Sequence, residues 1–263
     1  MNTTTTYAYD GTLEGFYSLV FKAFLYKRVP TEIVNRQNQS QMTLEEVIEV
    51  ETIPEHARRV RDGLIKRTGD KNARLVHVAF LNESKETDML LWRYLHKVFN
   101  DDTGTLHRNL LDPDVYDLVQ CARKVRKEVH RFHGFIRFQK SSDGMYFAPI
   151  DPDNDIVRLL APHFKSRFAD QEWVIYDVRR KYGIWYNKEK VQEVRFNKPA
   201  FDFTSGYIRK QASDLDEKYY RTLWQHYYDA INIIERQNQR QMKAFMPKRY
   251  WRYLPEKNLR QSR

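Results

Sequence analysis

The chain has 263 residues and a formal net charge of +10, from 45 Lys and Arg residues against 35 Asp and Glu residues. Hydrophobic residues make up 41% of the chain and aromatic residues 14%, which excludes a disordered protein because disordered chains lack the apolar side chains of a core. The single cysteine, Cys121, excludes an intramolecular disulfide, a cysteine-based zinc site and a cysteine-ligated iron–sulfur cluster. We therefore expect a folded protein of a reducing, cytoplasmic environment.

The first part of the chain is predicted to form mainly helices. Leu13, Phe16, Val20 and Phe24 recur at helical spacing, so residues 12–26 are predicted to form an amphipathic helix, capped by Asp10 or Thr12. The polar segment 27–44 is expected to be irregular. The remaining predictions for this part are a short strand at 7–9, a strand near 47–53, and helices at 54–67, 70–82 and 86–99.

The second part of the chain mixes both periodicities. Asp112 and Pro113 open a long helix, and after Gly134 the period changes to two, which predicts a hairpin over 134–150 with its turn at Asp143-Gly144. Further predicted elements are a helix at 153–168 interrupted by Pro162, two strands within about 172–187, and a long C-terminal helix at 214–245. This order predicts an α+β fold, an antiparallel sheet packed by several helices. We expect an N-terminal segment, 1–83, packed on a larger domain, 84–263.

The positive charge is concentrated in a few segments. Residues 236–263 contain nine basic residues and one acidic residue, and residues 121–137 contain six basic residues and one acidic residue. A weaker basic segment covers 54–74. Such segregation can make one face of a molecule positive, which favours anionic partners. No apolar run reaches the roughly 18 residues of a membrane span, so no association with a membrane is expected. Only nine glycines are present and none forms a glycine-rich phosphate motif, so no glycine-rich nucleotide-binding loop is expected.

Two apparent metal motifs are weak. His130-x-x-His133, with His163, could supply three ligands, but neighbouring cations would repel a metal, so a structural or phosphate-contacting role is favoured. The segment 151–155 (DPDND) imitates the start of a calcium loop but continues with unsuitable residues, so helix capping is favoured there. No metal and no cofactor are predicted.

Catalytic candidates are few. His163 shares a predicted helix face with Arg167, either as part of a packed amphipathic helix or as a phosphate or base contact, and the two interpretations stay open. Asp177 ends a predicted strand, and we favour an ion pair with an arginine over acid–base chemistry. Cys121 is interpreted as a core thiol. The residues named for a catalytic alternative are His163, Asp177 and His133.

The basic C-terminal segment, 236–256, also contains Tyr250 and Trp251. Cations attract phosphates and aromatic rings stack on bases, so this composition suits a single strand or a flipped base. A basic helix end whose aromatic residues pack on the core fits equally well. Nucleic-acid-binding candidates over the whole chain are Arg123, Lys127, Arg131, Arg137, Arg167, Arg236, Arg240, Lys248, Arg249, Tyr250 and Trp251.

Six short motifs, in order along the chain, carry a resemblance to one family. They are YDGTLEGF at 9–16, Phe135-x-Arg137-Phe138, YFAP at 146–149, APHF at 161–164 with Arg167-Phe168, Trp173-x-Ile175-x-Asp177, and MPKRYW at 246–251. The chain resembles the bacterial DNA-repair or DNA-metabolism proteins that are encoded beside a radical SAM protein with helix-hairpin-helix elements. From about residue 84 onward it also resembles the uncharacterised domain fused behind uracil-DNA glycosylase-like domains.

The resemblance implies a role in DNA metabolism but no particular reaction. Glycosylase chemistry belongs to the fused neighbour, and one cysteine cannot hold a radical SAM cluster. The first hypothesis is a DNA-binding accessory protein of repair or base modification that acts on single-stranded or damaged DNA with a radical SAM partner. The alternatives are a nuclease or base-processing hydrolase that uses His163 and Asp177, and a scaffold that binds another protein.

Overall fold

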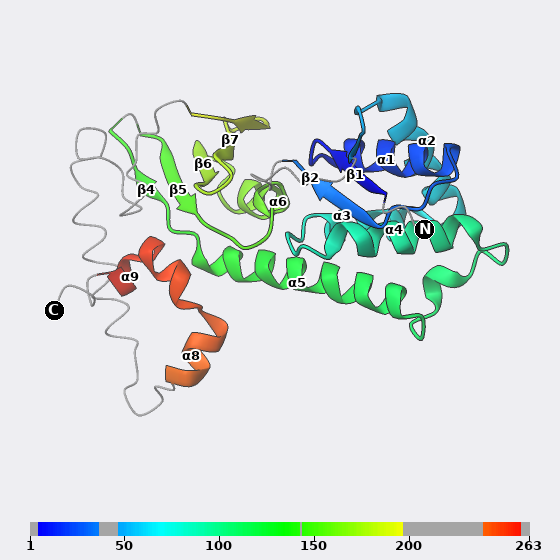
Figure 1. The fold of residues 1–263 in the computed structure, drawn as a ribbon. Coiled ribbons are helices and arrows are strands. Elements are labelled where there is room, and N and C mark those ends of the chain that lie inside the picture. The colour runs from blue at the N-terminus through cyan, green and yellow to red at the C-terminus, as the bar shows by residue number, and fades with distance from the viewer. Residues whose placement is uncertain (1–4, 37–46, 143, 197–238, 259–263) are drawn as a thin grey trace. The chain divides into compact units, whose positions relative to one another are not determined.

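The computed structural model describes residues 5–36, 47–142, 144–196 and 239–258, and the account below is confined to them. The chain consists of two compact units, residues 1–126 (unit 1) and 127–263 (unit 2) (Figure 1). Helix and strand are mixed in both units, so the predicted α+β class is confirmed.

Unit 1 contains a small parallel sheet. Its strands are β1 (Thr6–Tyr9), β2 (Glu32–Asn35) and β3 (Val47–Glu49), in the order β2-β1-β3. Strand β1 is entirely buried. The prediction of irregular structure throughout 27–44 was wrong at β2, because Ile33 and Val34 are buried and the strand bonds to β1 in parallel register. A strand this short is stabilised mainly by pairing with its neighbour. Because that neighbour is distant in the sequence, the local residue pattern does not reveal the pairing.

Helices surround this sheet (Figure 1). The side chain of Thr12 caps the first helix by accepting a hydrogen bond from the backbone N–H of Gly15, as an N-cap residue should. Phe16, Leu19 and Val20 lie on its buried face, which confirms the amphipathic pattern. The helices are α1 (Leu13–Leu25), α2 (Pro54–Thr68), α3 (Asp70–Phe80), α4 (Thr87–Asn100) and the 3₁₀ turn η1 (Leu106–Arg108).

Helix α5 (Pro113–Phe135) is the longest described element. Its first part contributes Val115, Leu118 and Ala122 to the core of unit 1. Its last part belongs to unit 2, where Phe132 is buried. The predicted change to a strand directly after Gly134 was wrong by several residues, because the helix continues to Phe135 and the next strand begins at Gln139.

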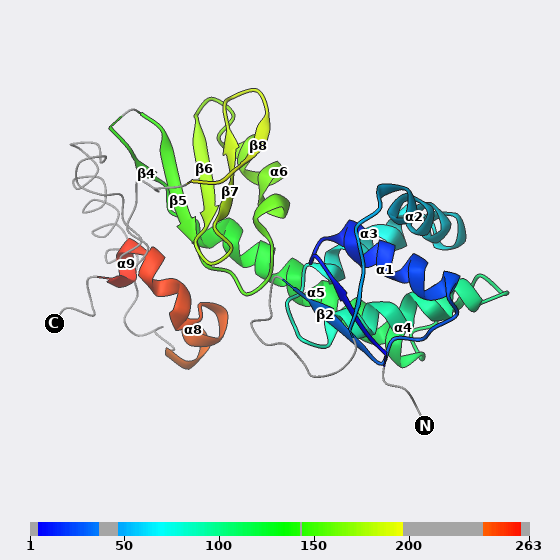
Figure 2. The ribbon, with the colours of Figure 1, turned by 45° about the horizontal axis from the view of Figure 1, so that its top comes forward.

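Unit 2 contains a five-stranded sheet with β4 (Gln139–Lys140), β5 (Tyr146–Ile150), β6 (Trp173–Asp177), β7 (Tyr182–Tyr186) and β8 (Val191–Val194) side by side in that order (Figure 2). The sheet is mixed, which corrects the predicted antiparallel sheet: β5 and β6 pair in parallel. Helix α6 (Val157–Arg167) connects them, and such a crossover returns the chain in the same direction. The other pairs are antiparallel.

Two prolines of unit 2 occupy tolerant positions. Pro149 lies in β5 beyond the two residues that pair with β4, where a missing N–H removes no bond from the ladder. Pro162 does not interrupt its helix as predicted, since α6 runs through it. Pro162 and Arg158, whose carbonyl loses its helical donor, are both exposed residues.

The C-terminal part of unit 2 consists of α8 (Gln239–Phe245), the 3₁₀ helix η4 (Lys248–Tyr253) and α9 (Pro255–Asn258). Most of the predicted helix at 214–245 lies outside the described residues; its described end is α8. None of the described helices is long and apolar enough to cross a bilayer.

Candidate functional site

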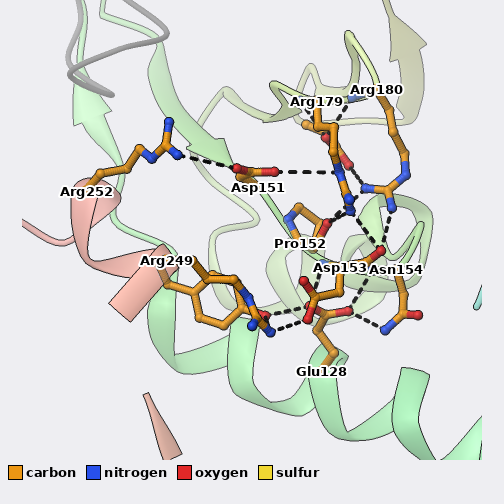
Figure 3. Close-up of polar contacts among 11 residues, drawn as sticks. Glu128, Asp151, Pro152, Asp153, Asn154, Arg179, Arg180, Arg249 and Arg252 are labelled. Atoms are coloured by element: carbon orange, nitrogen blue, oxygen red, sulfur yellow. Dashed lines mark hydrogen bonds and ion pairs between the residues drawn. The ribbon is translucent and has the colours of Figure 1, made fainter. Parts of the chain in front are cut away.

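The acidic turn between β5 and α6 is the centre of a charged network in unit 2 (Figure 3). The prediction that its aspartates cap α6 was wrong: the N-cap residue is Ile156, and no side chain caps the helix. Instead, Asp151 and Asp153 meet arginines from two other segments. The turn therefore holds separate parts of unit 2 together.

Glu128 of α5 anchors the acidic turn through its carboxylate. Its side chain is buried, with 3% of the residue exposed. Its carboxylate accepts hydrogen bonds from the backbone N–H groups of Asp153 (2.7 Å) and Asn154 (2.9 Å), the Asn154 side-chain amide (2.6 Å) and the Tyr250 hydroxyl (2.7 Å). A buried carboxylate without partners would be very costly, and these four donors satisfy it.

Arg179 and Arg180, in the turn between β6 and β7, hold the same segment from the other side. Arg180 pairs with the fully buried Asp177 at 2.5 Å and donates to the Asp153 carbonyl at 2.9 Å. Arg179 donates to the same carbonyl at 2.8 Å and also to that of Pro152. Burial raises the pKa of Asp177, and the adjacent Arg180 opposes this rise. Asp177 is thus part of an ion pair that orders the turn.

The C-terminal motif docks on this network. Tyr250 is buried, and its ring packs against Phe132 and Phe135, with ring centroids 5.0 and 5.8 Å apart. Because only 2% of the residue is exposed, Tyr250 is a core residue of unit 2 and offers no free face to a base. Its hydroxyl donates to Glu128. Arg249 pairs with Asp153, and Arg252 lies 3.9 Å from Asp151. The half-buried Trp251 donates from Nε1 to the Met246 carbonyl at 3.0 Å.

Arg137 is also occupied by the C-terminal segment. Its guanidinium pairs with the buried carboxylate of Glu256 at 2.8 Å and donates to the Gly134 carbonyl at 2.6 Å. This pair fastens α9 to the segment that follows α5. Arg137 therefore has a structural role that the basic pattern of 121–137 did not distinguish from phosphate binding.

Other predicted nucleic-acid contacts lie on the surface. Along α5, Arg123 and Lys127 are exposed and Arg131 is half-buried; Lys124 and Arg126 beside them are also exposed. Among the described residues, no carboxylate lies within ion-pairing distance of these five, which we call the α5 cations. The same holds for the exposed side chains of Arg167, Arg240 and Lys248. Arg236 lies outside the described residues.

The two predicted catalytic histidines are neighbours. The rings of His133 and His163 stack with centroids 4.0 Å apart and planes inclined by 12°. Nε2 of His133 is buried and has no hydrogen-bond partner in the described part of the chain. Burial lowers the pKa of His133, and the nearby His163 and His130 lower it further.

Asp177 is not joined to these histidines by any hydrogen bond or ion pair within the ranges that the structure describes. Over the same ranges, no group of three or more His, Cys, Asp or Glu residues could hold a metal ion. The described geometry therefore brings His133 and His163 together but does not assemble them with Asp177.

Sequence reasoning did not identify Glu128, Arg179, Arg180 and Arg252 as site residues. For Glu128 a signal existed: it lies three residues after Val125 and four before Phe132, on the apolar stripe of α5. A carboxylate on such a stripe indicates a buried acid with dedicated donors. The arginines gave no comparable signal, because exposed and paired arginines look alike in sequence.

Comparison with known proteins places the network within one domain family. The searches of curated proteins and of solved structures each found no match. A family model described as "Domain of unknown function (DUF4130)" matches residues 85–256. The matched region covers more than half of the chain and includes every residue of the network from Glu128 to Arg252. The chain belongs to the DUF4130 family.

Proposed function

We propose that this protein is a DNA-binding accessory factor of a DNA-repair or DNA-modification pathway, and that the α5 cations contact DNA phosphates. One observation carries the proposal: Arg123, Lys127 and Arg131 follow one another at intervals of one helical turn, and no carboxylate in the described part of the chain neutralises them. Arg137 and Arg180, by contrast, form ion pairs with the buried carboxylates of Glu256 and Asp177.

Unneutralised cations in a row suit a polyanion. From Arg123 to Arg131 the helix advances about 12 Å, at about 1.5 Å per residue. Each cation that replaces a counterion on a phosphate makes binding more dependent on salt. The row carries no base-reading geometry, so it supports affinity for the backbone rather than recognition of a sequence.

The radical SAM partner is supported by the sequence resemblance alone. The chain has one cysteine, which is buried and donates a weak hydrogen bond to the Ala79 carbonyl. A cysteine-ligated cluster would therefore be held by the partner. Co-purification of the two proteins, followed by DNA-shift assays of each alone and of both together, tests this part of the proposal.

The hydrolase alternative has less support. Asp177 is engaged with Arg180, and His133 and His163 pack against each other and against Phe164. These contacts engage the three residues in packing and ion pairing, and in the described ranges none of them joins Asp177 to the histidines.

A salt titration of duplex DNA binding tests the proposed function. The triple variant Arg123→Gln, Lys127→Gln and Arg131→Gln removes three charges while keeping good helix formers in α5. We expect the slope of log K against log salt concentration to fall by about 2.7, because each lost phosphate contact contributes about 0.9.

A matched control removes three exposed cations that lie outside α5, by Lys66→Gln, Lys85→Gln and Arg108→Gln. Both triple variants have the same net charge. Equal slopes in the two variants would mean that only overall charge matters, and no DNA binding by the unaltered protein would reject the proposal in favour of a protein-binding scaffold.

A further inference from the structure

Helix η4 presents three distinct faces. A 3₁₀ helix has three residues per turn, so side chains three positions apart stand above one another. The six residues of η4 therefore form three pairs: Lys248 with Trp251, Arg249 with Arg252, and Tyr250 with Tyr253. Each pair has a different environment.

The tyrosine face fixes the helix in place. Tyr250 is buried and donates to Glu128, and the hydroxyl of the half-buried Tyr253 is also shielded from solvent. Beyond the helix, the ion pair of Arg137 with Glu256 holds α9. The backbone of η4 is thus anchored through Tyr250 and Glu256, and Arg249 donates a further hydrogen bond to the Tyr250 hydroxyl at 3.0 Å.

The arginine face meets the acidic turn (Figure 3). Arg249 reaches Asp153, and Arg252 reaches Asp151, so two guanidinium groups face two carboxylates. The side chains of Arg249 and Arg252 are 48% and 47% exposed, and that of Asp153 is 52% exposed. The 3.9 Å between Arg252 and Asp151 is beyond hydrogen-bonding distance. The side chain of Asp151 is less exposed, at 25%. Ion pairs between partly exposed side chains such as these contribute little to stability.

We propose that Arg249 and Arg252 bind two successive phosphates of a nucleic-acid strand, and that Asp151 and Asp153 occupy this face when no strand is bound. One turn of a 3₁₀ helix separates the two arginines by about 6 Å along the axis, a spacing comparable to that of neighbouring phosphates in an extended strand. The planar guanidinium matches a phosphate as well as a carboxylate, because both accept its paired N–H groups. The identification of the ligand rests on the proposed function.

When the two arginines turn from the aspartates to phosphates, the aspartates keep other partners or solvent. Asp151 also lies 3.7 Å from Nε of Arg179, so it stays beside a cation when Arg252 turns to a phosphate. Asp153 is exposed enough to be hydrated, while its backbone stays bound to Glu128 and Arg179. The acidic turn therefore acts as an internal competitor that lowers affinity for the strand without requiring the fold to open.

Removal of the competing carboxylates tests this proposal. The probe is a fluorescent single-stranded thymidine oligonucleotide, and the variant is Asp151→Asn with Asp153→Asn, which preserves shape and the backbone hydrogen bonds. We expect binding to tighten by about 2- to 30-fold. Each exposed ion pair that no longer has to be broken raises the affinity by a factor of about 1.4 to 5, and two such pairs are removed. The salt slope should change little, because the same two phosphates are contacted with and without the carboxylates. Loss of Arg249 and Arg252 should instead lower the slope by about 1.4, since each single-strand phosphate contact contributes about 0.7.

Three comparisons make the result specific. Adding Arg249→Gln and Arg252→Gln to the double variant should abolish the gain. The control Asp170→Asn with Glu193→Gln adds the same charge to unit 2 and releases Arg158 and Arg195 from Glu193, yet should give less gain. If the double variant melts at a lower temperature, Asp153→Asn alone, which leaves Asp151 in place, should still show a smaller gain.

An unchanged affinity of the folded double variant, an equal gain in the control, or a gain that survives loss of both arginines would each overturn the inference. Binding by the unaltered protein that depends on the α5 cations but not on the acidic turn would overturn the inference and leave the proposed function intact. Absence of binding by every variant would overturn both.

Discussion

Asp88 makes the stability of unit 1 depend on pH. The carboxylate lies at the start of α4 and accepts a hydrogen bond from the Tyr9 hydroxyl at 3.1 Å. Burial raises the pKa of Asp88 to about 6, and the Tyr9 hydrogen bond only partly opposes this shift. Burial also raises the pKa of Tyr9, so the hydroxyl remains a donor.

The sign follows from the raised pKa. Below the ordinary pKa of an aspartate, Asp88 is protonated in both the folded and unfolded states, and its contribution to stability is fully present. As the pH rises through 6, the buried group ionises and that contribution is lost. The pKa difference of about two units corresponds to about 3 kcal/mol between pH 4 and pH 7.5.

The variant Asp88→Asn resembles the protonated acid at every pH and still accepts from Tyr9. We expect it to unfold like the unaltered protein near pH 4 and to be more stable by up to about 3 kcal/mol at pH 7.5. Hydrogen exchange of β1 peptides, together with urea unfolding, reports on unit 1 separately from unit 2. A stability difference that does not change with pH, or a variant less stable at pH 7.5, would refute this reasoning.

Three further changes have expected outcomes. Gly15→Ala places a methyl group against the Asp10 carboxylate, so we expect a loss of about 1–3 kcal/mol in thermal or urea unfolding; an unchanged stability would show that the loop yields easily. Tyr250→Phe removes a donor from buried Glu128 and should cost about 1.5–3 kcal/mol, with faster proteolysis at 239–258; equal proteolysis rates would contradict the anchoring role. Burial raises the pKa of Cys121, so iodoacetamide at pH 8 should label it only after unfolding, as mass spectrometry can show; rapid labelling of the native protein would argue against the buried thiol.

The helices of unit 1 could be predicted because their apolar residues recur every three or four positions. In α1 and α4 that stripe faces one continuous core, so local pattern and final packing agree. Strand β2 could not be predicted, because only two of its four residues are buried and its parallel partner lies far away in sequence.

The direction of the strands in unit 2 needed more than pattern. Gly144 ends a hairpin turn as predicted and has a positive φ of 87°. The helix between β5 and β6 was also expected, but whether a crossover sets two strands in parallel depends on which strands become neighbours. The alternation after Gly134 was misleading, since Phe135 remains helical and packs against Tyr250.

Within the site, sequence identified cations but not their partners. Arg137 and Arg123 belong to the same basic segment, yet only Arg137 meets a buried acid. The partner, Glu256, lies 119 positions away, and no local rule predicts a pair so distant. For Asp177 the favoured ion pair could be predicted from the local sequence, because Arg180 follows three residues later.

The three-residue repeat of η4 has a consequence for the DUF4130 family as a whole. If the helix keeps its three faces, a cation must recur after three residues, as at Arg249 and Arg252. A tyrosine must recur at the same interval, as at Tyr250 and Tyr253. An insertion or deletion of one residue would turn every later side chain by about 120° and exchange the faces. Family members that share this arrangement should therefore differ here by substitution and never in length.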